Sequence, residues 1–280
     1  LSDRNTRIER AVAMISGDRQ GRIWIASEAQ NLFCYDLKEQ SLRNYILTEH
    51  SLVSTNVKCL TVDNSGTIWI GFYGDGLFYS KDNLKTLHPY LSPVDNEETY
   101  NDDVVSKIVL GAYNCLYISS LKGGVKELNL TSGKLRDLLL KDENNEAIYC
   151  RTLLVYTDNE LWIGTESGVY IYNLRTEKYT HLRSSEYDPY SLSDNAIYSF
   201  CKDREDGIWI GSYFGGVNYY PRSYTYFEKY YPKGIENSLH GKRVREFCRD
   251  SQGILWIGTE DGGLNRFNLK TKDFSFFAHS

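Results

Sequence analysis

Carboxylates are the side chains of this sequence best suited to catalysis, because 37 of its 280 residues are aspartate or glutamate. A glycoside hydrolase needs two of them to converge on one bond. Four aspartates, however, stand six residues before a recurring tryptophan, in a short polar turn: Asp18, Asp63, Asp203 and Asp250. A residue that recurs in the same turn of successive repeats indicates a structural role, and no other carboxylate pair stands out. We therefore predict no catalytic residue and a segment that is not an enzyme.

Histidine and cysteine spacing argues against a metal centre. The five histidines form no HxH or HExxH pattern, and the six cysteines form no CxxC pair. We expect free, mostly buried thiols, no metal and no cofactor. The formal net charge is −5 and there is no basic block, so a nucleic acid is not an expected partner.

The elements that must position any site repeat along the whole chain. The phrase Ile254-Leu255-Trp256-Ile257-Gly258-Thr259 recurs five more times, once with tyrosine in place of tryptophan. The predicted structural anchors are Trp24, Trp69, Tyr117, Trp162, Trp209 and Trp256. They are 45, 48, 45, 47 and 47 residues apart. A fixed period in this range indicates a repeat architecture.

One repeat contains four short strands. In the last copy they are residues 244–249, 254–257, 264–269 and 274–277, separated by turns rich in Asp, Gly and Lys. Four antiparallel strands in each repeat make one blade of a β-propeller, and the apolar Trp strand is expected to be sandwiched between neighbouring blades. We therefore predict an all-β fold, a single β-propeller domain over residues 1–280. Its six blades span roughly residues 1–51, 52–98, 99–143, 144–190, 191–237 and 238–280. Either six blades close the ring, or the chain is most of a seven-bladed propeller.

Candidate binding residues are those that break the repeat on the rim formed by the turn after the Trp strand and the blade connectors. Tyr73, Tyr213 and Phe214 replace polar residues there, and aromatic faces can stack on sugar rings. Cationic candidates stand near the starts of first strands and could bind an acidic sugar: Arg151, Lys242 and Arg243. The alternative is that the aromatic residues only cover a blade edge.

The pattern Asp-x-x-Gly-x-Ile-Trp-Ile-Gly-Thr, followed by Gly-Gly-Leu and a Phe-rich strand, resembles the two-component regulator propeller repeat. Residues 250–277 match it nearly throughout, and the connector Asn237-Ser238-Leu239 belongs to the same pattern. The resemblance implies a periplasmic sensor region of a hybrid two-component receptor, which detects an oligosaccharide and signals to a histidine kinase in the full-length protein. It implies as partners an oligosaccharide and other domains of the same receptor, with a homodimer as a further candidate.

Two other functions stay open on the sequence alone. Propellers also serve as enzymes, such as lyases or hydrolases acting on a sugar or lactone, and as scaffolds for protein interaction. A carboxylate or metal cluster at the central funnel would favour an enzyme. An aromatic pocket without such groups would favour sensing, and a continuous apolar face would favour a scaffold.

Overall fold

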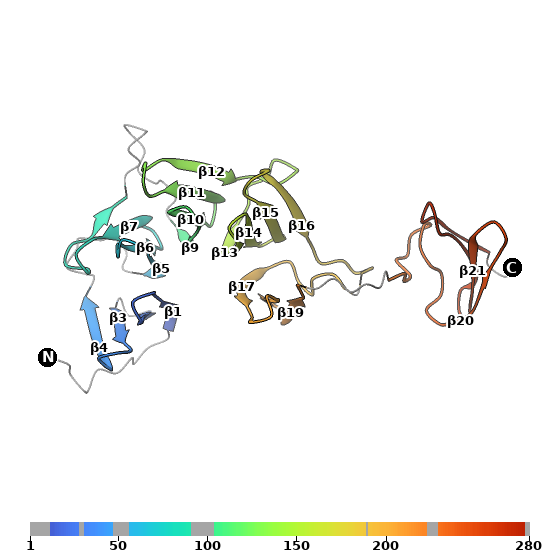
Figure 1. The fold of residues 1–280 in the computed structure, drawn as a ribbon, viewed down its shortest axis with the longest axis horizontal. Coiled ribbons are helices and arrows are strands. Elements are labelled where there is room, and N and C mark those ends of the chain that lie inside the picture. The colour runs from blue at the N-terminus through green and yellow to red at the C-terminus, as the bar shows by residue number, and fades with distance from the viewer. Residues whose placement is uncertain are drawn as a thin grey trace. The chain divides into compact units, whose positions relative to one another are not determined.

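Each copy of the Trp phrase forms the second strand of an antiparallel sheet in a computed structural model of the chain (Figure 1). The structure describes residues 12–27, 31–46, 56–90, 104–188, 190–222 and 229–277. Strands and turns account for all the regular structure of these residues. They contain no helix long and apolar enough to cross a membrane.

The strands of each sheet pair in the order in which they occur along the chain. The first sheet contains β1 (Val12–Gly17), β2 (Arg22–Ser27), β3 (Asn31–Asp36) and β4 (Ser41–Ile46). The second contains β5 (Val57–Val62), β6 (Ile68–Phe72), β7 (Leu77–Ser80) and β8 (His88–Pro89). The third contains β9 (Val105–Leu110), β10 (Cys115–Ser120), β11 (Val125–Asn129) and β12 (Leu135–Leu139). The fourth contains β13 (Cys150–Thr157), β14 (Glu160–Thr165), β15 (Gly168–Asn173) and β16 (Lys178–Leu182).

The last two sheets follow the same plan. The fifth contains β17 (Ile197–Lys202), β18 (Ile208–Ser212) and β19 (Val217–Tyr220) within the described residues. The sixth contains β20 (Val244–Arg249), β21 (Ile254–Thr259), β22 (Gly263–Asn268) and β23 (Phe274–Phe277). The predicted all-β class, with blades built as four-stranded antiparallel meanders, is confirmed.

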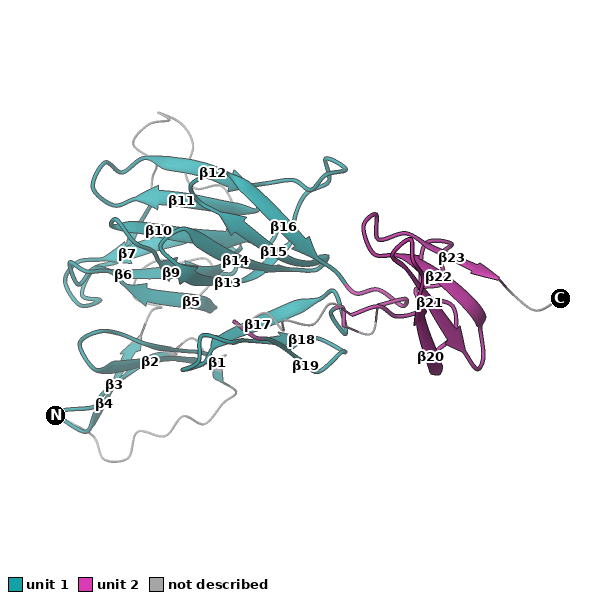
Figure 2. Cartoon of the chain, turned by 45° about the vertical axis from the view of Figure 1, so that its right-hand side comes forward, with its two compact units in different colours: residues 1–183, 192–220 teal, residues 184–191, 221–280 magenta. Residues whose placement is uncertain are grey.

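The chain divides into two compact units, drawn teal and magenta in Figure 2. Unit 1, residues 1–183 and 192–220, holds the first five sheets. Unit 2, residues 184–191 and 221–280, holds the sixth sheet. The expectation that all six blades form one domain stays a prediction.

In unit 1 the sheets pack on each other through their first strands, with β1 against β5, β5 against β9, β9 against β13, and β13 against β17. The apolar core therefore consists of layers between successive sheets. Each layer contains the anchor of the earlier sheet: Trp24, Trp69, Tyr117 or Trp162. These anchors are at most 6% exposed.

Trp209 departs from this pattern, because it is 46% exposed. The other four anchors in unit 1 pack against the sheet that follows their own, and no described sheet of unit 1 follows β17–β19. In unit 2, Trp256 is half-buried and stacks on Phe277, while the core of that sheet is formed by Leu239, Ile257 and Phe267.

The recurring aspartates hold both the turn and the anchor. In the second sheet one oxygen of Asp63 accepts the N–H groups of Ser65 and Thr67 at 2.9 and 3.0 Å. The other oxygen accepts the indole N–H of Trp69 at 2.9 Å. The same Asp–Trp bond joins residues 18 and 24 at 2.9 Å, 203 and 209 at 3.1 Å, and 250 and 256 at 2.9 Å. These four aspartates therefore have the structural role in the turn that the repeat predicts, and their carboxylate oxygens accept hydrogen bonds from the turn and the anchor.

Candidate functional site

A β-bulge recurs near the start of the first strand of each sheet. The pairing of the first strand with the second skips one residue there, so that the skipped side chain is not part of the regular ladder. Bulges re-aim side chains and are common beside functional sites. In sheets two to six the skipped residues are Lys58, Ser106, Arg151, Tyr198 and Arg245.

The residue that follows each second strand lies beside this bulge. Its main-chain N–H donates to a carbonyl that precedes the bulge, as from Tyr73 to Asn56 at 3.0 Å and from Tyr213 to Ala196 at 2.9 Å. The skipped residue of the bulge and the residue after the second strand thus form a side-chain pair, and three of these pairs differ in chemistry. The ammonium of Lys58 lies 5.3 Å from the ring centroid of Tyr73, Arg151 forms an ion pair with Glu166, and Tyr198 stacks on Tyr213. The same β-bulge therefore presents a different side-chain pair on each of these three sheets.

Arg151, Tyr198, Tyr213 and Phe214 form a continuous group, which we call the rim cluster. The guanidinium carbon of Arg151 lies 4.8 Å from the ring centroid of Tyr198. Tyr198 and Tyr213 are stacked with centroids 5.0 Å apart and planes inclined by 24°. Phe214 meets Tyr213 edge-on at 4.4 Å. The cluster thus joins the fourth and fifth sheets across the surface of unit 1.

The rim cluster is open to solvent while its backbone is held. Phe214 is 87% exposed and Tyr213 is 58% exposed. The main-chain N–H of Phe214 donates to Asp194 at 2.9 Å. That bond, with another from the N–H of Ala196, lowers the pKa of Asp194, so the carboxylate stays charged and holds the loop. Exposed aromatic residues on a fixed backbone are typical of a binding surface.

The chemistry available to the rim cluster is recognition. Its rings offer apolar faces for stacking, and Arg151 offers N–H donors, although Glu166 already pairs with it. Across the described parts of the chain, no group of three or more His, Cys, Asp or Glu residues is placed to hold a metal ion.

The other residues proposed from the sequence are not members of this cluster. Tyr73 is 51% exposed and pairs with Lys58 on the second sheet. Lys242 and Arg243 belong to unit 2, where their main-chain N–H groups donate to Asp261 at 2.9 and 3.2 Å. We assign neither cation to the rim cluster. Their role as ligand contacts stays a prediction.

Sequence reasoning missed Tyr198, which is central to the cluster. It occupies the same position of the repeat as Arg151, the second residue of the first strand, and Arg151 was selected for its charge. Comparing that one position across the repeats would have found Tyr198.

The family model described as two component regulator propeller matches residues 51–74, 191–214 and 238–261. Three segments of the chain are thus similar to two-component regulator propeller repeats. Each matched segment runs from the blade connector past the Trp strand. The second one includes three members of the rim cluster: Tyr198, Tyr213 and Phe214. Among curated proteins there is no significant match.

Solved structures share the fold of this chain. The extracellular domain of the hybrid two-component system BT3049 from B. thetaiotaomicron is 24% identical with a TM-score of 0.68, over 97% of this chain and 34% of that one. The extracellular domain of the hybrid two-component system BT4673 from the same organism is 19% identical with a TM-score of 0.65, over 99% and 36%. PorZ, a surface component of the type-IX secretion system of Porphyromonas gingivalis, is 14% identical with a TM-score of 0.60, over 99% and 46%. The chain thus spans about a third of the length of the two-component structures.

Proposed function

We propose that this chain is a non-catalytic, extracytoplasmic part of a two-component signalling receptor, and that its rim cluster contacts an oligosaccharide. The propeller repeats and the extracellular sensor-type domains that share the fold support the receptor. In the full-length protein the segment would lie in the periplasm and pass its signal to a histidine kinase. Its other partners would be further domains of that receptor or a second copy of the chain.

The observation that carries the ligand proposal is the exposed stack of Tyr198 and Tyr213, with Arg151 over one ring and Phe214 against the other. A sugar ring has an apolar face that fits a flat aromatic side chain and hydroxyl groups that fit a guanidinium. A purely structural role would not require Phe214 to be 87% exposed.

The test is calorimetric titration of the whole chain with a panel of neutral and acidic oligosaccharides. We expect saturable binding of at least one glycan, which chromatography recovers unchanged. Tyr213→Ala should weaken it by about tenfold, since truncating a central aromatic contact costs more than ~1 kcal/mol.

Tyr179→Ala is the matched control, because Tyr179 is 38% exposed but lies on β16, the outermost strand of the fourth sheet. We expect this change to leave the affinity unaltered. An equal loss in both variants, or turnover of the glycan, would contradict the proposal.

A further inference from the structure

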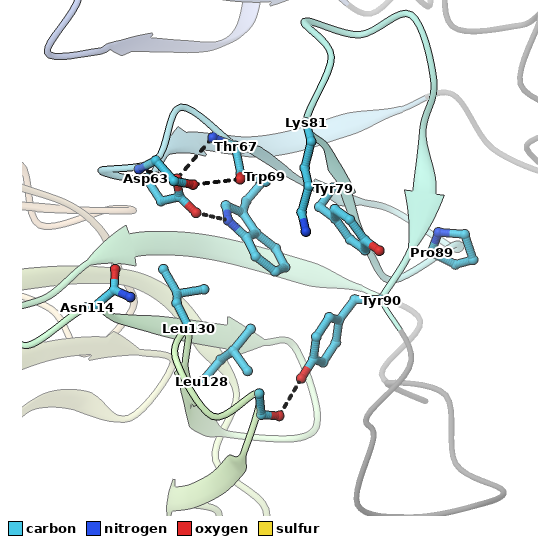
Figure 3. A pocket seen from close by; sticks show the side chains of 12 residues that line it. Asp63, Thr67, Trp69, Tyr79, Lys81, Pro89, Tyr90, Asn114, Leu128 and Leu130 are labelled. Carbon is cyan, nitrogen blue, oxygen red and sulfur yellow. Dashed lines mark hydrogen bonds between the residues drawn. The ribbon is translucent and has the colours of Figure 1, made fainter.

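A cavity of about 440 Å³ lies between the second and third sheets of unit 1 (Figure 3). It is lined at the edge formed by the turn of Asp63, the end of β7 and the turn between β9 and β10. The turn of Asp63 precedes β6, whereas the rim residue Tyr73 follows β6 at its opposite end. The cavity is therefore separate from the rim positions. Its volume is within the range of sites that hold a small molecule, roughly 300–1,000 Å³.

Aromatic rings form one wall of this cavity. The ring of Trp69 lies 5.4 Å from that of Tyr79 and 5.7 Å from that of Tyr90, between centroids. The hydroxyl of Tyr90 donates to the carbonyl of Gly133 at 2.9 Å, which fixes that ring across the two sheets. Leu128 of the third sheet lies beside Tyr90 and also lines the cavity (Figure 3). A planar ligand could lie against this wall with an apolar face.

Lys81 supplies the charge of the cavity. Figure 3 shows its side chain extending toward the space between Trp69 and Tyr79, and its ammonium lies 5.7 Å from the Tyr79 centroid. Within the described ranges Lys81 forms no ion pair. The carboxylate of Asp63 also lines the cavity, but it accepts bonds from Thr67 and Trp69. Lys81 therefore favours an anion at its end of the cavity.

Charged side chains bridge the two neighbouring sheet junctions. Between sheets one and two, Arg22 donates to Asn83 at 3.1 Å, and between sheets three and four, Arg136 pairs with Glu177 at 2.8 Å. At the junction of sheets two and three, Gly111 stands where the other turns have aspartate, and Asn114 of the same turn donates to Thr131 within its own sheet. Within the described residues Lys81 forms no such bridge to the third sheet, and it lines the cavity instead.

We propose that this cavity binds a sugar acid, with the carboxylate on Lys81 and the apolar face of the ring against Tyr79 and Tyr90. The amide of Asn114 and the hydroxyl of Ser65 line the same cavity and suit the ring hydroxyls. An aromatic wall, a single unpaired cation and polar groups at the far end match a hydroxylated ring carboxylate better than a neutral sugar. The site does not depend on the rim cluster or on the function proposed for it.

The experiment is titration of the whole chain with glucuronate, galacturonate and glucose, followed by the indole signals in two-dimensional NMR. Trp69→Phe assigns the Trp69 signal. We expect a uronate to shift that signal with saturation, and glucose to bind at least about tenfold more weakly.

Lys81→Gln should weaken uronate binding at least about tenfold without changing the thermal midpoint. Lys85→Gln, an exposed lysine outside the cavity, should change nothing. Tyr213→Ala should also leave uronate binding intact, which separates this site from the rim cluster. The proposal is overturned if no uronate shifts the Trp69 signal, or if Lys81→Gln binds uronate as the native chain does.

Discussion

Asp63→Ala removes the one group that holds both the turn and the anchor of the second sheet. Trp69 is 6% exposed and Thr67 is 5% exposed, so water cannot easily replace the carboxylate at either N–H. Each buried donor left without a partner costs about 1–3 kcal/mol, and we expect a loss of about 2–4 kcal/mol in the free energy of unfolding. Asp203→Ala removes the same set of bonds in the fifth sheet, but Trp209 is 46% exposed. Water can reach that indole, and the loss should be smaller by about 1–2 kcal/mol.

The assay is urea unfolding of the native chain and the two variants, followed by tryptophan fluorescence. Asp63 and Asp203 both belong to unit 1, so each change acts on the same unit. An unchanged slope with urea would show that only stability has changed. Asp63→Asn, which keeps one oxygen acceptor, should fall between the native chain and Asp63→Ala. Equal losses for Asp63→Ala and Asp203→Ala would refute the reasoning, because burial of the indole would then be irrelevant.

Two further predictions concern the packing between sheets. Gly71→Ala should destabilise unit 1 by about 1–3 kcal/mol, because the added Cβ would lie 2.6 Å from the sulfur of Cys59 and 2.6 Å from a methyl of Val105. Gly17→Ala, whose Cβ would meet nothing within 4 Å, should change the denaturation midpoint little, and a similar loss there would contradict the steric argument. Burial raises the pKa of the Cys59 thiol to about 12 and that of Cys34 to about 11, from 9.0. Because the folded pKa is raised, their contribution to stability is complete below pH 9 and is lost as the pH rises through 11–12, by up to about 1.4 kcal/mol per pH unit for each thiol. Above pH 9 the free energy of unfolding of Cys34→Ala and of Cys59→Ala should fall less steeply with pH than that of the native chain. An equal slope with pH in the variants and the native chain would contradict this account.

The blades were predictable because their signals are local. The recurring Trp phrase, the aspartate turns and the alternation of apolar residues each depend on a few neighbours along the chain, and the six sheets follow them within the described residues. The role of Asp63 as a turn residue could be read in the same way. Its second bond, to the indole of Trp69, depends on how the hairpin folds back and was not visible in the sequence.

The rim cluster could be predicted only in part. Tyr213 and Phe214 stood out because they break the repeat, and Arg151 because it is charged. Their assembly with Tyr198 requires two bulged strands of neighbouring sheets to lie side by side, which is a property of sheet packing. The exposure of Trp209 was not foreseen either, because the sequence pattern around it is the same as around the buried anchors.

The sequence by itself determined the repeat, the all-strand class, the anchors and the turns, because each is set by residue types at short spacing. The tertiary structure decided which side chains meet. It placed Arg151 over Tyr198 from the next sheet, and it left Lys81 facing a cavity between the second and third sheets. Such contacts join residues about 50 positions apart, and they depend on the register and packing of whole sheets, which no local pattern specifies.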